Sequence, residues 1–140
     1  MGTPTSLTVN YLRRHGIKCG SVERWIPQAK KRIDLLGFID IVAVDTTRGK
    51  IIGIQATSFP NLSARVEKII DLRKEEALDW LACGGEIQVW TWVKRKRLRE
   101  NAKGVVKSLV TQVGRITFVD REVIRTGEYD WEELGGDRNG

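Results

Sequence analysis

The chain has 140 residues, with 24 lysines and arginines against 18 aspartates and glutamates, and its pI is about 9.6. This is the usual size of one domain, so we expect a single domain over residues 1–140, and the basic charge favours polyanionic partners. The N-terminus lacks a signal-peptide pattern and no apolar run approaches the ~20 residues that cross a bilayer, which predicts a cytoplasmic protein without a membrane partner.

Capping, turn and apolar patterns predict the elements of the first two thirds of the chain. Thr3-Pro4 provides an N-cap followed by proline at the first helical position, which favours a helix there. The stretch GFIDIVAVD is rich in β-branched residues and gives the clearest strand. In chain order we predict a helix over residues 4–16, strands at 22–26 and 37–45, a turn at 46–50, a strand at 51–56, a helix over 62–81 and a strand at 86–92.

The last third of the chain is basic at first and acidic afterwards. Residues 94–103, KRKRLRENAK, form the densest basic run, and a weaker periodic stretch then precedes a predicted strand at 116–124. The tail is acidic and polar, and its end is expected to fray. We therefore predict a basic C-terminal helix/strand extension over residues 94–126 and an acidic, partly disordered tail over residues 127–140.

Cysteine and histidine content excludes several kinds of site. Cys19 and Cys83 are far apart and form no C-x-x-C pair, which indicates reduced thiols. The single histidine, His15, stands at the end of a predicted helix, so neither a zinc site nor a Ser-His-Asp hydrolase is expected. No glycine-rich phosphate loop follows a strand, which leaves small-molecule nucleotide chemistry without support.

Asp40 places a carboxylate inside the most apolar predicted strand. An isolated buried charge costs several kcal/mol unless something compensates it, and a divalent cation is one compensation. A turn-capping role or an ion pair with Arg32 is the alternative interpretation. The predicted hairpin brings Gln55, the one polar interior residue of the next strand, towards Asp40 at the same end of a sheet.

Oxygen atoms near Asp40 are suited to a hard divalent cation, because Mg²⁺ takes about six oxygen ligands and often keeps some of its waters. The Asp40 carboxylate, the Gln55 amide oxygen and the Ala56 carbonyl are three candidate ligands. Glu23 on the preceding strand adds a second carboxylate, and Asp34 is an alternative acid. We therefore predict Mg²⁺ or Mn²⁺ as the cofactor.

These residues also carry a resemblance to a known superfamily. Its signature is an aspartate in a strand after a small turn, then a strand with Glu or Gln, one residue and Lys, followed by a helix. GFID ending at Asp40 resembles the first half, and Gln55-Ala56-Thr57 in IIGIQATS resembles the second. From about Thr5 to Trp92 the chain thus resembles the PD-(D/E)XK nucleases, the restriction-endonuclease-like group that includes archaeal Holliday-junction resolvases and VRR-NUC domains.

The resemblance implies an α/β fold with a restriction-endonuclease-like αβββαβ core, in which a mixed central sheet is flanked by helices. This core would span residues 5–93. Glu23 would correspond to the additional acidic residue that such enzymes place near the first helix or strand. Small nucleases of this group often pair to address two strands, so the resemblance also implies a homodimer.

Thr57 departs from the signature, because it stands where the superfamily has its lysine. Threonine can neither carry the positive charge nor assist deprotonation of the attacking water. In this superfamily the lysine is able to migrate to a neighbouring helix, so the resemblance implies Arg65 and Lys68 as catalytic substitutes. A solvated basic helix face is the alternative reading of these two residues.

Two basic segments are expected to contact DNA phosphates. They comprise Lys30, Lys31 and Arg32 before the Asp40 strand, and Lys94, Arg95, Lys96, Arg97 and Arg99 after the strand at 86–92. A solvated helix start is the alternative for the second segment. Trp90 and Trp92 share one sheet face and are predicted to pack beneath a helix rather than to stack on bases.

The sequence therefore predicts a metal-dependent DNA endonuclease that hydrolyses phosphodiester bonds, with selectivity for structures such as junctions as a further expectation. The alternative is a catalytically impaired protein of the nuclease fold that binds nucleic acid without cutting it. Thr57 and the uncharged Gln55 motivate this alternative.

Overall fold

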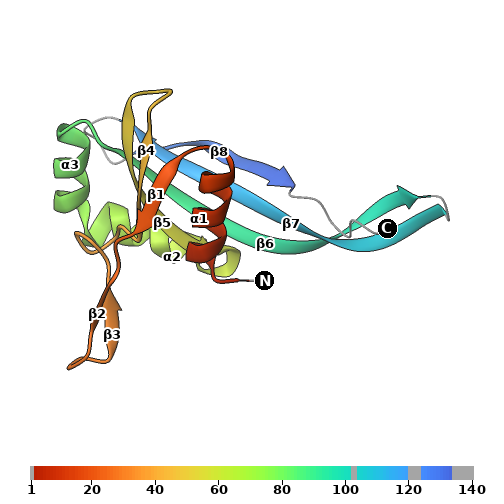
Figure 1. The fold of residues 1–140 in the computed structure, drawn as a ribbon, viewed down its shortest axis with the longest axis horizontal. Helices are drawn as coiled ribbons and strands as arrows, with labels where there is room; N and C mark the ends of the chain where they lie inside the picture. The colour runs from red at the N-terminus through yellow and green to blue at the C-terminus, as the bar shows by residue number, and fades with distance from the viewer. Residues whose placement is uncertain (1, 102–103, 120–123, 134–140) are drawn as a thin grey trace.

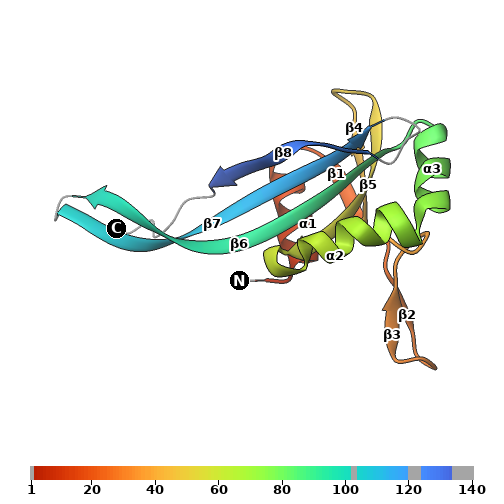
Figure 2. The same cartoon turned by 180° about the vertical axis from the view of Figure 1, so that it is seen from behind.

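The computed structural model describes residues 2–101, 104–119 and 124–133. Helices pack on both faces of a mixed sheet in which β5 and β6 are parallel and the other neighbouring strands antiparallel (Figures 1 and 2). In spatial order this sheet contains β1 (Lys18–Ser21), β4 (Ile41–Asp45), β5 (Lys50–Ser58), β6 (Glu86–Asn101), β7 (Gly104–Val119) and β8 (Ile124–Glu133). The predicted mixed α/β class is confirmed.

Helix α1 (Pro4–Arg14) begins where the sequence predicts, because the Thr3 side chain accepts a hydrogen bond from the Ser6 N–H and caps the helix. It covers one face of the sheet, on which Trp90 and Trp92 are buried. The Trp92 Nε1–H donates to Thr8 Oγ1 of α1 at 2.9 Å. Packing of both tryptophans beneath a helix is therefore confirmed.

The opposite face is covered by a helical segment that is interrupted rather than continuous, so the single helix predicted over residues 62–81 is wrong. The chain forms a 3-10 turn, η1 (Phe59–Asn61), then α2 (Leu62–Glu67), a π-helical turn, η2 (Lys68–Leu72), and α3 (Lys74–Ala82). The Arg73 N–H closes the π turn by donating to the Lys68 carbonyl at 2.8 Å. In a continuous helix residue 73 would lie about three turns beyond the buried Leu62, on the same face. The interruption therefore keeps an arginine out of the core.

The predicted strand at residues 22–26 is partly wrong. The first strand of the sheet is β1, which ends at Ser21, and residues 24–26 belong instead to a separate two-stranded ribbon. In this ribbon β2 (Arg24–Ile26) pairs with β3 (Lys31–Ile33), and it projects away from the body of the protein (Figures 1 and 2). Glu23 thus lies in the connection between β1 and β2, not on a strand of the sheet.

Asp40 lies immediately before β4, whereas the sequence predicts a strand from residue 37. The preceding residues form a tight turn, in which Leu36 and Gly37 have positive φ angles of 54° and 82°. The Asp40 backbone is nevertheless fixed, because its N–H donates to the Ile54 carbonyl and its carbonyl accepts from the Val22 N–H, both at 2.8 Å. The hairpin turn before β5 is confirmed.

The predicted C-terminal helix is wrong, because β6 continues through the basic run to Asn101 and pairs with β7 along that length. The two strands form a long hairpin that reaches beyond the helices (Figure 1). Part of the predicted strand at 116–124 lies in β7, while residues 120–123 fall outside the described residues. Of the predicted tail, residues 127–133 lie in β8, and residues 134–140 lie outside the described residues.

Within the described chain, no helix has the length and apolar character required to cross a membrane.

Candidate active site

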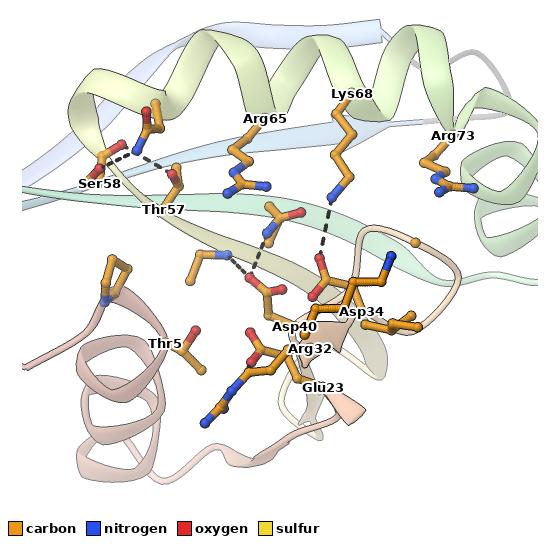
Figure 3. A pocket seen from close by; sticks show the side chains of 17 residues that line it. Thr5, Glu23, Arg32, Asp34, Asp40, Thr57, Ser58, Arg65, Lys68 and Arg73 are labelled. Atoms are coloured by element: carbon orange, nitrogen blue, oxygen red, sulfur yellow. Dashed lines mark hydrogen bonds and ion pairs between the residues drawn. The ribbon is translucent and has the colours of Figure 1, made fainter. Parts of the chain in front are cut away.

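A pocket of about 730 Å³ lies between the first turn of α1 and the helical segment α2–η2, where β4 begins and β5 ends (Figure 3). Its lining combines five basic side chains with three carboxylates. The basic residues are Lys31, Arg32, Arg65, Lys68 and Arg73, and the acidic residues are Glu23, Asp34 and Asp40. Most of the residues predicted for catalysis, metal binding and phosphate contact are therefore neighbours in space.

The β4–β5 hairpin fixes the Asp40 carboxylate at the base of this pocket. Asp40 is only 3% exposed. Its Oδ2 accepts hydrogen bonds from Gln55 Nε2 at 2.7 Å and from the Ala56 N–H at 2.9 Å. Because the N–H and C=O of one strand residue leave the strand on the same side, the Ala56 carbonyl also lies on the Asp40 side. The structure thus places Asp40, Gln55 and Ala56 together.

Glu23 and Asp34 complete a carboxylate cluster with Asp40. One oxygen of each lies within 4.8 Å of the others. Arg32 pairs with Glu23 at 3.3 Å, so the alternative ion pair between Arg32 and Asp40 is not what the structure shows. Asp34 is paired with Lys68 Nζ at 3.6 Å. Its position in the cluster makes Asp34 a stronger candidate for a metal ligand than the sequence alone suggests.

The crowding of these carboxylates changes the protonation of Asp40. Desolvation by burial and a hydrogen bond with Asp34 raise the pKa of Asp40 to about 8, and the charges of Asp34 and Glu23 act in the same direction. The hydrogen bond from the Ala56 N–H opposes part of this rise. At neutral pH the metal-free cluster therefore retains a proton on Asp40.

This proton predicts a pH-dependent stability in metal-free protein. The unfolded chain releases the Asp40 proton near the ordinary pKa of 3.8, whereas the folded protein keeps it up to about 8, so the free energy of unfolding should fall with rising pH between these values. The loss contributed by Asp40 is at most about 1.4 kcal/mol per pH unit. Urea denaturation in EDTA at about pH 5 and about pH 8 should show a smaller fall for Asp40→Asn than for wild type. If the free energy of unfolding falls equally in both proteins, the raised pKa of Asp40 is contradicted.

Gln55 carries an unused acceptor beside the carboxylate cluster. Its side chain is buried, and Oε1 finds no hydrogen-bond partner among the residues that the structure describes. A buried acceptor without a partner is costly, and an oxygen-binding cation would satisfy it. The carboxylate oxygens and this amide oxygen form a hard-donor set, which fits Mg²⁺ or Mn²⁺.

Basic side chains reach into the pocket from the opposite wall. Arg65, Lys68 and Arg73 extend from the helical segment towards the carboxylates (Figure 3). Arg73 was not singled out by sequence reasoning, because its position depends on the interruption of the helix. Gly37 packs against it so closely that a Cβ at position 37 would overlap the Arg73 side chain. Thr57 also lines the pocket, but its buried hydroxyl donates to the Ser58 carbonyl at 3.3 Å and supplies no charge.

The other predicted phosphate-binding residues lie elsewhere. Lys30 occupies the exposed turn of the ribbon, and Lys94 is exposed on β6; neither belongs to the pocket lining. The side chains of Arg95, Lys96, Arg97 and Arg99 lie outside the described residues, and only their backbone is traced in β6.

A second hollow continues from the pocket along α1. The two share Thr5, Glu23 and Arg32, and the second extends past Asn10 and Arg13. A path next to the carboxylates is thus lined by hydrogen-bond donors, which suits an extended anionic chain. Sequence reasoning missed Asn10 and Arg13, because nothing in their spacing distinguishes them from solvated residues of an amphipathic helix.

No protein-family model, curated protein or solved structure matches the chain. The chemistry of the pocket itself is therefore the basis for inferring a function. Carboxylates facing basic side chains suit a divalent cation and a phosphate group bound side by side.

Proposed function

We propose that the protein is a divalent-metal-dependent DNA endonuclease with a restriction-endonuclease-like core. The observation that carries this proposal is the unpartnered Gln55 Oε1 beside the clustered carboxylates of Glu23, Asp34 and Asp40. The sequence of elements also supports it. A helix, α1, precedes the sheet strands β1, β4 and β5, and the interrupted helical segment and β6 follow, with the ribbon as an insertion.

Asp40, Gln55 and one or both of the other carboxylates would hold Mg²⁺ or Mn²⁺. A bound cation supplies Lewis acidity towards the phosphodiester and a lowered pKa for the attacking water. The chain contributes positioning and charge: Arg65 and Arg73 bind phosphate oxygens across the pocket from the carboxylates. Lys68, paired with Asp34, supplies the ammonium that Thr57 lacks.

The charge of the pocket supports a polyanionic substrate. Five basic side chains face three carboxylates, and Asp40 keeps a proton at neutral pH in the metal-free protein. A divalent cation in the cluster would make the pocket still more positive. Nucleic acid carries one negative charge per phosphate and can therefore neutralise this excess of positive charge.

The test is a cleavage assay with supercoiled plasmid, linear duplex, single-stranded DNA and a four-way junction. We expect wild type to cut at least one of them with Mg²⁺ or Mn²⁺, to be inactive in EDTA, and to lose activity on Asp40→Ala. Intact DNA in every combination, or cleavage that Asp40→Ala leaves unchanged, would refute a nuclease function at this site.

A second candidate function is DNA binding without cleavage. Two residues favour it. Thr57 carries no positive charge where the motif has its lysine, and Gln55 offers the metal an uncharged oxygen instead of a carboxylate. Under this alternative, wild type and Asp40→Asn bind DNA with the same salt-dependent affinity, and neither cuts. Metal-dependent cleavage that Asp40→Asn abolishes would exclude it.

Arg13 provides a prediction about the path of the DNA. Arg13 lines the hollow along α1 and donates to the Cys19 carbonyl at 3.3 Å, whereas the adjacent Arg14 is exposed and is absent from the residues that line it. Arg13→Gln should weaken DNA binding by roughly threefold to tenfold and reduce its salt dependence, as expected for one lost phosphate contact. Arg14→Gln is the matched control, and an equal loss in both variants would indicate a general charge effect.

A further inference from the structure

The β2–β3 ribbon carries the most exposed tryptophan whose side chain the structure describes. Trp25 is 55% exposed, whereas Trp90 and Trp92 are buried in the core. The ribbon projects from the body of the protein (Figures 1 and 2), which agrees with the exposure of this indole. Tryptophan is enriched at binding interfaces, and an indole on a projecting element offers its ring to a partner.

The charge of the ribbon indicates the chemistry of its partner. Residues 24–33, RWIPQAKKRI, contain four basic residues and no acidic residue. Trp25 stands directly opposite Arg32 in the antiparallel register, so their side chains share one face of the ribbon. The aromatic ring therefore lies on a ribbon whose own charged residues are all basic, and Arg32 also pairs with Glu23 beside the ribbon. This composition suits a polyanion with planar groups.

The ribbon is also one wall of the candidate active site. Lys31, Arg32 and Ile33 of β3 line the pocket, and the Arg32 guanidinium reaches Glu23 of the carboxylate cluster. An anionic chain held in the pocket would consequently pass along the ribbon. Cations that follow a phosphate backbone next to an aromatic ring on which bases stack are the usual means of binding single-stranded nucleic acid.

We infer that the β2–β3 ribbon binds unpaired nucleotides, with a base stacked on Trp25 and an adjacent phosphate held by Arg32, which lies on the same face of the ribbon. This inference rests on the proposed function for the class of partner. It adds a preference for DNA with unpaired bases next to the site of cleavage, since a base inside an intact duplex cannot offer its face to the indole.

Fluorescence anisotropy in EDTA tests the inference without any cleavage. A labelled oligothymidine and a labelled duplex are titrated with wild type, Trp25→Leu and Trp25→Phe. We expect Trp25→Leu to weaken binding of the oligothymidine on the order of tenfold while duplex binding changes less than about twofold. Trp25→Phe should keep most of the affinity. Leu72→Ala, which truncates an apolar side chain on η2 that is even more exposed than Trp25, is the matched control and should bind as wild type does.

Several results would overturn the inference. One is an oligothymidine affinity that Trp25→Leu leaves unchanged, and another is an equal loss for duplex. If Trp25→Leu binds DNA as wild type does but no longer binds phosphatidylserine vesicles, the ribbon binds a membrane instead. If it keeps DNA binding but loses self-association, the ribbon binds a second copy of the chain. Failure of the nuclease proposal is distinguishable, because a wild type that binds oligothymidine through Trp25 but never cuts refutes catalysis alone.

Discussion

Replacement of Lys68 by alanine is expected to reduce metal-dependent DNA cleavage by on the order of a hundredfold or more. Lys68 Nζ lies 3.6 Å from Asp34, within the carboxylate cluster, and its side chain extends into the pocket from η2 (Figure 3). Arg65 reaches the same pocket, but its planar guanidinium is suited to binding phosphate oxygens, whereas the ammonium of Lys68 lies beside Asp34. Rates of plasmid nicking and junction cleavage measure the effect.

Lys74→Ala is the control for this prediction, because Lys74 is an exposed lysine at the start of α3 outside the pocket lining. It should cut DNA at the wild-type rate. Binding of Mn²⁺ should survive in Lys68→Ala, since the oxygen ligands remain. A Lys68→Ala protein that cuts as fast as Lys74→Ala would show that the lysine missing at position 57 is not replaced from the helix.

Replacement of Trp92 by alanine is expected to give the largest loss of stability, about 3–5 kcal/mol in the free energy of unfolding. Trp92 is buried between α1 and the sheet, and its indole N–H donates to Thr8, which is itself fully buried. The variant leaves a cavity in the interface that holds α1 and removes one of the two hydrogen bonds of the Thr8 hydroxyl, which still donates to the Pro4 carbonyl at 2.8 Å. Because Pro4 and Thr5 of α1 line the pocket, DNA binding should weaken as well.

Urea denaturation separates these contributions. Trp92→Phe keeps most of the buried volume but loses the hydrogen bond to Thr8, so it should be less destabilised than Trp92→Ala. Trp25→Ala is the control for the loss of an exposed tryptophan and should change the free energy of unfolding by less than about 0.5 kcal/mol. A loss below about 1 kcal/mol for Trp92→Ala would contradict the packing described for α1.

The neighbourhood of Asp40 and Gln55 is predictable from the sequence. Apolar patterning marks both strands, and the turn between them fixes their register, so Ile41 pairs with Ile54. The residue before Ile41 and the residue after Ile54 then meet at the same end of the hairpin. In the structure their side chains are joined by a hydrogen bond of 2.7 Å.

Arg73 and Asp34 are not predictable in the same way. The segment KIIDLR continues a helical pattern, and only the packed structure shows that the helix is interrupted at Arg73 instead of burying it. Asp34 lies between the ribbon and a turn that contains two consecutive residues of positive φ. Neither segment has a periodicity that fixes where its side chains point.

The C-terminal extension shows how tertiary pairing overrides local preference. The run KRKRLRENAK is dominated by residues with high helix propensity, which favours the helix expected there. Residues 94–101 of this run form the second half of β6 because they pair residue by residue with β7, whose sequence GVVKSLVTQV is rich in β-branched residues. The partner that decides the outcome lies in a different segment of the chain.

Equilibrium binding of Mn²⁺ to metal-free protein, followed by electron paramagnetic resonance of the free ion, tests the central claim most directly. We predict one site in wild type whose affinity rises with pH towards about 8 as the Asp40 proton is displaced. Asp40→Asn and Gln55→Leu should each weaken this site by about tenfold or more, while Asp71→Asn, at an exposed acid on η2, should not. Wild type that binds no Mn²⁺, or binds it no better than Asp40→Asn, would contradict a metal centre at these carboxylates.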